Sequence, residues 1–253
     1  MAPLRTRLLA AAALLVAIAA CGGRGFGRQY EYEEQLYLRP DGSAAVVLNA
    51  SVPALIALRG LALDPGPRAR IDRGEVREMV SEPGLEIARV SRPWRRNGRQ
   101  FIQIRAEIDD VTKLGDTKLF KWSTYALTAP PEGMREYRQL VGAPPGAPPP
   151  GVGWDGSELV AFKLHVPSRI RSHNVRLLDT DEPGGHERGN ILTWEQRLGD
   201  RLAGKPVDIQ VSMESGSILY RTLWLFGLSF GAAMALLAAI IWMIIRRGRR
   251  RRR

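Results

Sequence analysis

The sequence has 253 residues, of which 45% are hydrophobic and 25% charged, with a single cysteine and a formal net charge of +11. Seven positive charges belong to the arginines after residue 245 and two to Arg5 and Arg7, which leaves +2 for the remainder. Because this remainder is nearly balanced, the composition argues against a nucleic-acid-binding surface. A single thiol also excludes an internal disulfide.

The first 21 residues have the three parts of a secretory signal. A short basic start is followed by an apolar run too short to span a bilayer comfortably. The residues Ile18-Ala19-Ala20-Cys21 resemble the lipobox of bacterial lipoproteins. The resemblance implies that the signal peptide, residues 1–20, is removed and that Cys21 becomes a lipidated N-terminus. The alternative is an ordinary signal peptide with an incidental cysteine.

Residues 222–245 predict a single transmembrane helix. The segment from Leu223 to Ile245 contains no charged residue, and Trp224 and Trp242 lie near its ends, where indole rings favour the headgroup region. Arg246 and Arg247 begin a basic tail, residues 246–253, which predicts a cytoplasmic C-terminus and an extracytoplasmic domain. The alternative is a buried core helix, which the apolar length and the seven arginines disfavour.

Small residues recur every fourth position along the predicted membrane helix, at Gly227, Gly231, Ala235 and Ala239. Small residues in this spacing let two helix backbones approach closely within a membrane. The pattern therefore predicts contact with a second copy or with another membrane protein. It is equally explained by the general abundance of glycine and alanine in membrane helices.

Between the two anchors, residues 21–221 predict an extracytoplasmic α+β domain with an antiparallel sheet and a few short helices. Apolar residues alternate in two hairpins whose turns are Asp41-Gly42 and Asn97-Gly98, and the hairpin face at residues 30, 32, 36 and 38 is apolar. Three later strands are predicted in the segments ELVAFKLHVPS, NILTWEQ and VDIQVSM.

Short helices are predicted at residues 53–63, 71–81 and 109–120, the last capped by Asp109 or Asp110. Residues 142–153 are rich in proline and glycine and predict an exposed, partly extended loop. This loop either separates two domains or lies within one. Trp122, Trp154 and Trp194 are expected in or beside the core.

The order of these features resembles the LppM-type domain of bacterial envelope lipoproteins. The features are the lipobox, the hairpin YLRPDGSAAVVLNASV, the final strands NILTWEQ and VDIQVSM, one membrane span and a basic tail. Residues 109–155 are longer than such a domain needs. The resemblance implies an extracytoplasmic binding module without established catalysis, and it assigns no site residues.

The sequence contains no specific catalytic or metal-binding pattern. Ser215 and Ser217 lack the spacing of a nucleophile turn. The three histidines, His165, His173 and His186, are expected to be solvated. The segment DTDEPGG at residues 179–185 begins like a calcium loop but has Pro183 at the third ligand position. The sequence predicts no catalytic residue, metal ligand or cofactor.

Trp94, Arg95 and Arg96 form a candidate contact with lipid headgroups near a hairpin tip, because indole suits the interface and arginine suits phosphate. The alternative is an ordinary exposed turn with a partly packed tryptophan.

We therefore expect a non-catalytic lipoprotein of the bacterial cell (inner) membrane. It would bind a membrane lipid, a cell-wall component or a partner protein, and no nucleic acid. The alternative is an extracytoplasmic hydrolase whose active-site residues are scattered in the sequence. A pocket with convergent titratable groups would favour the hydrolase, and an apolar groove would favour the binding module.

Overall fold

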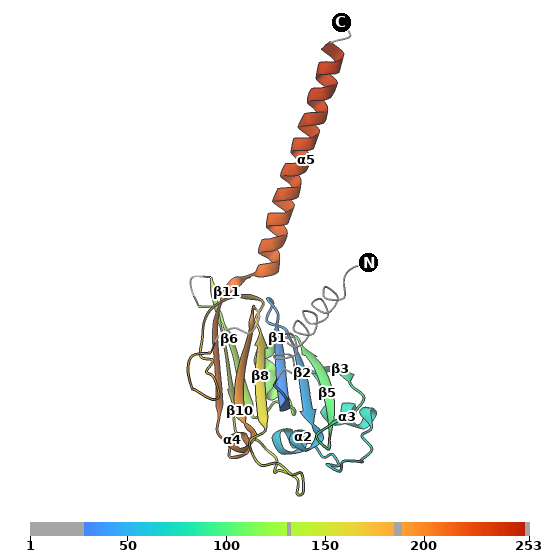
Figure 1. The fold of residues 1–253 in the computed structure, drawn as a ribbon, viewed down its shortest axis with the longest axis vertical. Helices are drawn as coiled ribbons and strands as arrows, with labels where there is room; N and C mark the ends of the chain where they lie inside the picture. The colour runs from blue at the N-terminus through green and yellow to red at the C-terminus, as the bar shows by residue number, and fades with distance from the viewer. Residues whose placement is uncertain (1–27, 131–132, 185–188, 251–253) are drawn as a thin grey trace, which may run out of the picture. The chain divides into compact units, whose positions relative to one another are not determined.

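A computed structural model describes residues 28–130, 133–184 and 189–250 (Figure 1). The chain divides into two units, Met1–Tyr30 and Glu31–Arg253, and only residues 28–30 of the first are described. The predicted signal peptide, Cys21 and His186 lie outside the described residues.

One sheet has seven strands, in the order β10-β8-β1-β2-β5-β3, with β4 paired to β5. Five strand pairs in it have antiparallel registers: β1–β2, β2–β5, β3–β5, β4–β5 and β8–β10. The strands are β1 (Tyr30–Leu38), β2 (Ala44–Ser51), β3 (Glu86–Val90), β4 (Trp94–Arg96), β5 (Arg99–Ile108), β8 (Leu159–His165) and β10 (Ile191–Arg197). Both predicted hairpins are present. Asn97 and Gly98 have φ values of 51° and 75°, as a tight two-residue turn requires.

The second sheet has four antiparallel strands in the order β6-β7-β11-β9. They are β6 (Ser123–Thr128), β7 (Met134–Val141), β11 (Val207–Ser217) and β9 (Ser168–His173). Only β11 was expected from the sequence. Buried side chains of both sheets belong to one hydrophobic cluster, which includes Leu36, Ile104, Tyr137 and Ile209. The structure confirms the α+β class.

The predicted short helices are present with adjusted ends. In α2 (Val52–Arg59), the Ser51 side chain accepts a hydrogen bond from the Ala54 N–H, and Gly60, at φ 66°, ends the helix before residue 63. The helix α3 (Arg73–Val80) is capped by Asp72, whose side chain accepts hydrogen bonds from the Gly74 and Glu75 N–H groups. The third is a 3-10 helix, η1 (Val111–Asp116), capped by Asp110. A fourth helix, α4 (Leu198–Leu202), was not expected from the sequence.

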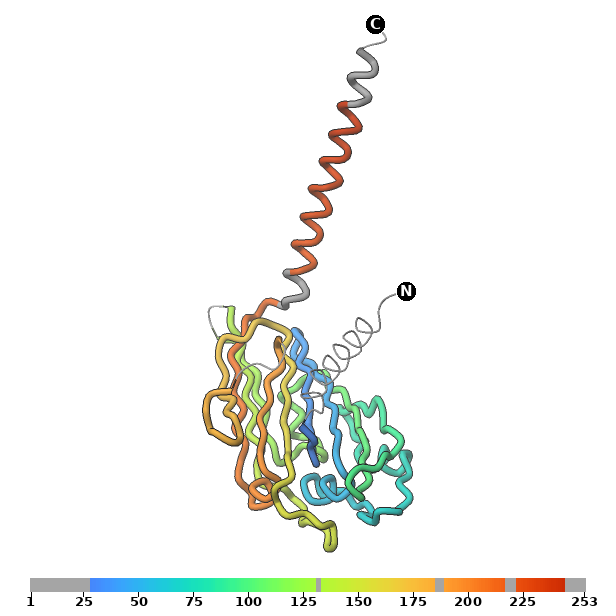
Figure 2. The backbone as a smooth tube through the Cα atoms, viewed as in Figure 1, coloured from blue at the N-terminus to red at the C-terminus, as the bar shows by residue number. Residues whose placement is uncertain are grey.

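The loop at residues 142–153 contains neither helix nor strand, but it is not simply exposed. The Gly146 N–H donates to the Ala57 carbonyl at 3.2 Å, and a Cβ at Gly146 would lie 2.2 Å from the Ile56 carbonyl oxygen. Only glycine allows this close approach to α2. The loop connects β7 of the four-stranded sheet to β8 of the seven-stranded sheet, and β7 pairs with β11, which comes after the loop in the sequence (Figure 2).

The last helix, α5 (Ile218–Arg250), directly follows β11. Its segment Thr222–Met243 is 22 residues long and is long and apolar enough to cross a membrane. Large apolar side chains along it are exposed, among them Phe226, Phe230 and Leu236.

Candidate functional site

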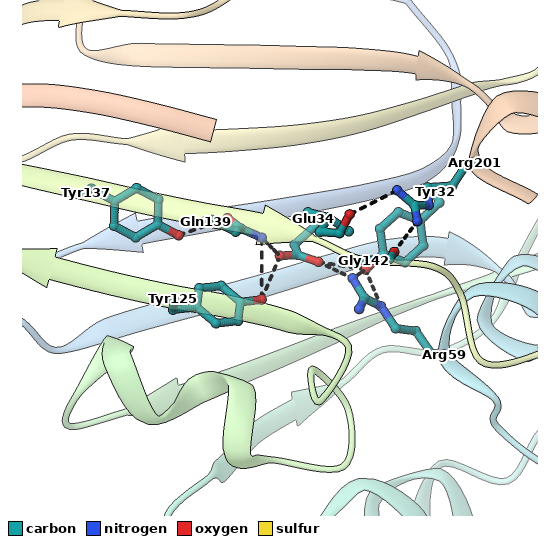
Figure 3. Close-up of polar contacts among 9 residues, drawn as sticks. Tyr32, Glu34, Arg59, Tyr125, Tyr137, Gln139, Gly142 and Arg201 are labelled. Carbon is teal, nitrogen blue, oxygen red and sulfur yellow. Dashed lines mark hydrogen bonds and ion pairs between the residues drawn. The ribbon is translucent and has the colours of Figure 1, made fainter. Parts of the chain in front are cut away.

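A carboxylate lies on the apolar face of β1. Glu34 follows Tyr32 and precedes Leu36 on the buried side of the strand, and 2% of its surface is exposed. A buried ionised carboxylate is tolerated only when it is paired and hydrogen-bonded. Both of its oxygens have such partners (Figure 3).

The first partner is Arg59, the last residue of α2, which is 4% exposed. Its Nη2 donates to Glu34 Oε2 and to the Tyr32 hydroxyl, and its Nε donates to the same hydroxyl at 2.7 Å. The Tyr32 hydroxyl in turn donates to Glu34 Oε2 at 2.9 Å. Because α2 ends at Gly60, the Arg59 side chain is fixed at the end of a buried helix.

The second set of partners comes from the smaller sheet. Gln139 Nε2 donates to Glu34 Oε1 at 3.0 Å, and the Tyr125 hydroxyl donates to the same oxygen at 3.4 Å. The Tyr137 hydroxyl donates to Gln139 Oε1 at 2.9 Å. Figure 3 shows this chain of side chains running from β7 and β6 to β1 and α2. One carboxylate therefore joins the two sheets and the helix.

The pKa values follow from this burial. Burial raises the pKa of Tyr32, Tyr125 and Tyr137 well above the usual value for tyrosine, and the negative charge of Glu34 raises all three further. Burial alone would lower the pKa of Arg59, but Tyr32 and Glu34 more than offset it and the pKa is raised. The tyrosines stay neutral donors, and Arg59 stays a cation.

A second buried arginine, Arg201 of α4, has carbonyl partners. Its guanidinium donates to the carbonyl oxygens of Val141, Gly142 and Lys205. Burial, together with the smaller effect of the positive charge of Arg59, lowers the pKa of Arg201 to about 10. Arg59 and Arg201 both line a cavity of about 10 Å³, which is room for about one water molecule.

A larger cleft of about 430 Å³ is also lined by Arg59. Its apolar lining includes Leu61, Met79, Leu119 and Trp122, and its cationic lining residues are Arg59, Lys118 and Lys121. Among the described residues, none that line the cleft is acidic, although Glu82 accepts a hydrogen bond from the Lys118 N–H at 2.7 Å. The volume falls in the range of small-molecule sites, about 300–1,000 Å³.

One guanidinium nitrogen of Arg59 is not satisfied by the protein. Its Nη1 is buried and has no hydrogen-bond partner in the described part of the chain. The guanidinium carbon lies 5.3 Å from the ring centres of both Phe120 and Trp122, so its remaining contacts are with aromatic faces. A guanidinium in this state can donate a hydrogen bond to an anionic group of a ligand.

A second hollow, of about 310 Å³, lies over β7, β9 and β11. Glu136, Arg138, Ser172, Gln210 and Ser212 are among its lining residues. It offers a polar sheet surface on which Glu136 and Arg138 give charges of both signs. The cleft beside Arg59 is the better candidate because it combines an apolar wall with charge of one sign.

The predicted headgroup residues lie on β4. Trp94 is 39% exposed and stacks on Phe101, with ring centres 5.9 Å apart. Arg95 is exposed. Arg96 differs from the expectation, because its guanidinium carbon lies 4.2 Å from the Phe101 ring centre and burial lowers its pKa. Because Arg96 packs against Phe101, its guanidinium is less available to a lipid headgroup.

The predicted membrane residues lie along α5. Trp224 and Trp242 are 57% and 58% exposed. A Cβ at Gly227 or Gly231 would meet no atom within 4 Å, and Ala235 and Ala239 are exposed as well. Arg246 and Arg247 are in the last turns of the helix. Contact between this stripe and a second helix stays a prediction.

The described histidines are more enclosed than expected. His165 stacks on Tyr37 with ring centres 3.8 Å apart, its Nε2 is 3.2 Å from Gln35 Oε1, and burial lowers its pKa. His173 Nδ1 accepts a hydrogen bond from the Val175 N–H at 3.3 Å. The expectation of solvated rings was therefore wrong for His165.

Two aspartates of the acidic loop near residue 180 form ion pairs with arginines. Asp179 lies 3.6 Å from the Arg197 guanidinium, and Asp181 lies 3.5 Å from that of Arg176. The described residues contain no group of three or more His, Cys, Asp or Glu that could hold a metal ion.

The sequence patterns do not predict the roles of Glu34, Arg59, Gln139 and Arg201. A signal for Glu34 was present, because it is the one acidic residue in the alternating face formed by residues 30, 32, 34, 36 and 38. Trp194 is buried and Trp154 and Trp122 are half-buried, as expected.

These features define an α+β domain, joined to a helix that could span a membrane, with a buried arginine beneath an amphipathic cleft. Comparison with protein-family models and with curated proteins gives no match. Among solved structures, the chain is similar to the folded domain of the LppM protein of Mycobacterium tuberculosis, determined by NMR. The identity is 12%, the TM-score is 0.36, and the match covers 76% of this chain and 94% of that chain. This is a weak resemblance in fold, and nothing about function follows from it.

Proposed function

We propose that the protein is a membrane-anchored, extracytoplasmic binding module without catalytic chemistry, whose cleft beside Arg59 holds an anionic amphiphile from the envelope. The apolar lining would contact the acyl chain or another apolar part of the ligand. Lys118, Lys121 and Arg59 would bind its phosphate or carboxylate. The observation that carries the proposal is the buried Nη1 of Arg59, a cationic donor without a protein partner beside an apolar cleft.

In this proposal, two anchors hold the module at the membrane. The α5 helix crosses the cell membrane with its arginine tail in the cytoplasm, and Cys21 carries a lipid after removal of residues 1–20. The small-residue stripe of α5 would contact a second membrane helix. Lipid on Cys21 is tested by Cys21→Ser, which should abolish incorporation of labelled fatty acid while α5 keeps the protein in the membrane fraction.

Co-purification tests the cleft. The full chain is extracted in mild detergent, and bound lipids are identified by mass spectrometry. We expect an anionic lipid with the wild type and on the order of tenfold less with Lys121→Glu. Lys113→Glu is the matched control, because it makes the same charge change at an exposed lysine that does not line the cleft. Equal recovery from both variants would exclude the cleft as the binding site.

A further inference from the structure

The tip of the β4–β5 hairpin extends past the strands beside it. Figure 1 shows β5 and β3 at one edge of the larger sheet. The register between β2 and β5 ends at Phe101, whereas β4 pairs with β5 from Phe101 to Arg99. The tip, residues 95–100, therefore lies beyond the registers that β2 and β3 form with β5.

The hairpin carries an indole on one face and an arginine on the other. Residues paired across an antiparallel ladder point to the same face, and successive residues alternate between faces. Trp94 pairs with Phe101 and stacks on it, yet remains exposed. Arg95 pairs with Gln100, so it lies on the opposite face, where it is also exposed.

The loop before α3 adds two more arginines beside the tip. The Gln100 amide Nε2 donates to the Gly66 and Ala69 carbonyls at 3.1 and 2.8 Å, which holds this loop against β5. Arg68 and Arg70 flank Ala69, and both are exposed. Two segments that are separate in the sequence therefore bring their basic residues to one edge of the sheet.

The arginines of this edge have no counter-charge within the described part of the chain. We call the exposed residues Arg68, Arg70, Arg92, Trp94 and Arg95 the Trp94 patch. None of its arginines has an ion-pair partner among the described residues. On the four-stranded sheet, by contrast, Arg138 and Arg171 each form an ion pair with a carboxylate. Asp64 and Asp72, on the same loop as the first two arginines, accept hydrogen bonds from backbone N–H groups instead.

Unpaired arginines around an exposed indole have the chemistry that an anionic lipid surface requires. Guanidinium groups form charge-assisted and often bidentate hydrogen bonds with phosphate. Indole rings favour the headgroup region of a bilayer, which a soluble polyanion does not offer. The combination therefore favours a lipid surface over a soluble anionic polymer.

We propose that the Trp94 patch is a peripheral contact surface for a bilayer of anionic phospholipids. Its arginines pair with the lipid phosphates, and the Trp94 indole enters the headgroup region. Because the tip has only two strands, headgroups reach both of its faces. This contact is separate from the ligand proposed for the cleft and does not rest on it.

Vesicle capture with the full chain tests this surface. The protein is kept soluble in a non-ionic amphipol, and sucrose-loaded vesicles that contain phosphatidylglycerol are added and sedimented. We expect capture by these vesicles, little capture by pure phosphatidylcholine, and weaker capture at high salt. Arg92→Gln/Arg95→Gln should lower the apparent affinity on the order of tenfold. Arg138→Gln/Arg169→Gln is the matched control, because it removes two exposed arginines from the four-stranded sheet.

Fluorescence quenching reports the position of the indole. Brominated phosphatidylglycerol in the vesicles should quench part of the tryptophan emission, and Trp94→Phe, which keeps a ring against Phe101, should remove that part. Lys121→Glu should retain capture and quenching, which separates the patch from the cleft.

Three results would overturn the proposal. They are equal loss of capture in the two arginine pairs, quenching of equal strength in Trp94→Phe, and loss of capture with Lys121→Glu. Binding of soluble polyphosphate without capture of vesicles would overturn it as well, because the patch would then be a site for a soluble polyanion.

Discussion

The interior of the domain contains charged side chains, and the surface of α5 is apolar. Each is the reverse of the arrangement that water favours. Glu34, Arg59 and Arg201 are charged and buried, whereas Phe226, Phe230 and other large apolar residues of α5 are exposed. Each arrangement is stable only with a partner that compensates it. The buried charges obtain theirs from the protein, and α5 requires one from outside, for which its apolar length fits a bilayer.

Removing one member of the buried pair should have the largest effect. Arg59→Met leaves the Glu34 carboxylate without its cation, and we expect the free energy of unfolding to fall by about 3–5 kcal/mol. Combining it with Glu34→Gln should cost less than the sum of the two single changes, because the two groups interact directly. Chemical denaturation of the full chain in detergent measures this coupling, and strict additivity would contradict a paired network.

A charge at the middle of α5 should have the next largest effect. Met234→Arg should make the free energy of membrane insertion less favourable by about 2.5–3.5 kcal/mol, because the guanidinium would have to enter the hydrocarbon layer. The measurement is the fraction of Cys21→Ser protein in the membrane, with Met234→Leu as control. If the arginine variant stays fully inserted, α5 is not the span.

The buried tyrosines should make the domain sensitive to alkali. Their pKa values are raised in the folded state, so their contribution to stability is complete below pH 10 and is lost as the pH rises above it. Absorbance of tyrosinate should show that Tyr32, Tyr125 and Tyr137 ionise only as the protein unfolds. Reversible ionisation of all six tyrosines near pH 10 in the folded protein would contradict their burial.

The smallest effect is expected from the small-residue stripe. Replacing Gly227 and Gly231 by Ile keeps the apolar length of α5 but prevents close approach of a second helix. Crosslinking of α5 to a neighbouring helix should decrease, while insertion is unchanged. Unchanged crosslinking would mean that the stripe reflects composition alone.

The contrast between the two regions also explains what the sequence could predict. Most strands of the larger sheet, β11 and α5 have clear apolar patterns, and these were predicted. The strand β7 was missed because its inward positions include Gln139, which interrupts the apolar alternation and hydrogen-bonds Glu34. A polar residue of the buried network therefore obscures the strand pattern in β7, whereas β1 has enough apolar neighbours on the same face to show it despite Glu34. The pairing of Glu34 with Gln139 also joins segments about 100 residues apart, which no local signal records.

The central claim is that the cleft beside Arg59 binds an anionic amphiphile, and a direct titration tests it best. The full chain in non-ionic detergent is titrated with a short-chain phosphatidylglycerol and with the matched phosphatidylcholine, and the heat of binding is recorded. We predict binding of the anionic lipid at least about tenfold tighter than the zwitterionic one, with the preference lost in Lys121→Glu and kept in Lys113→Glu. Equal affinities for the two lipids, or the same loss in both variants, would contradict the account.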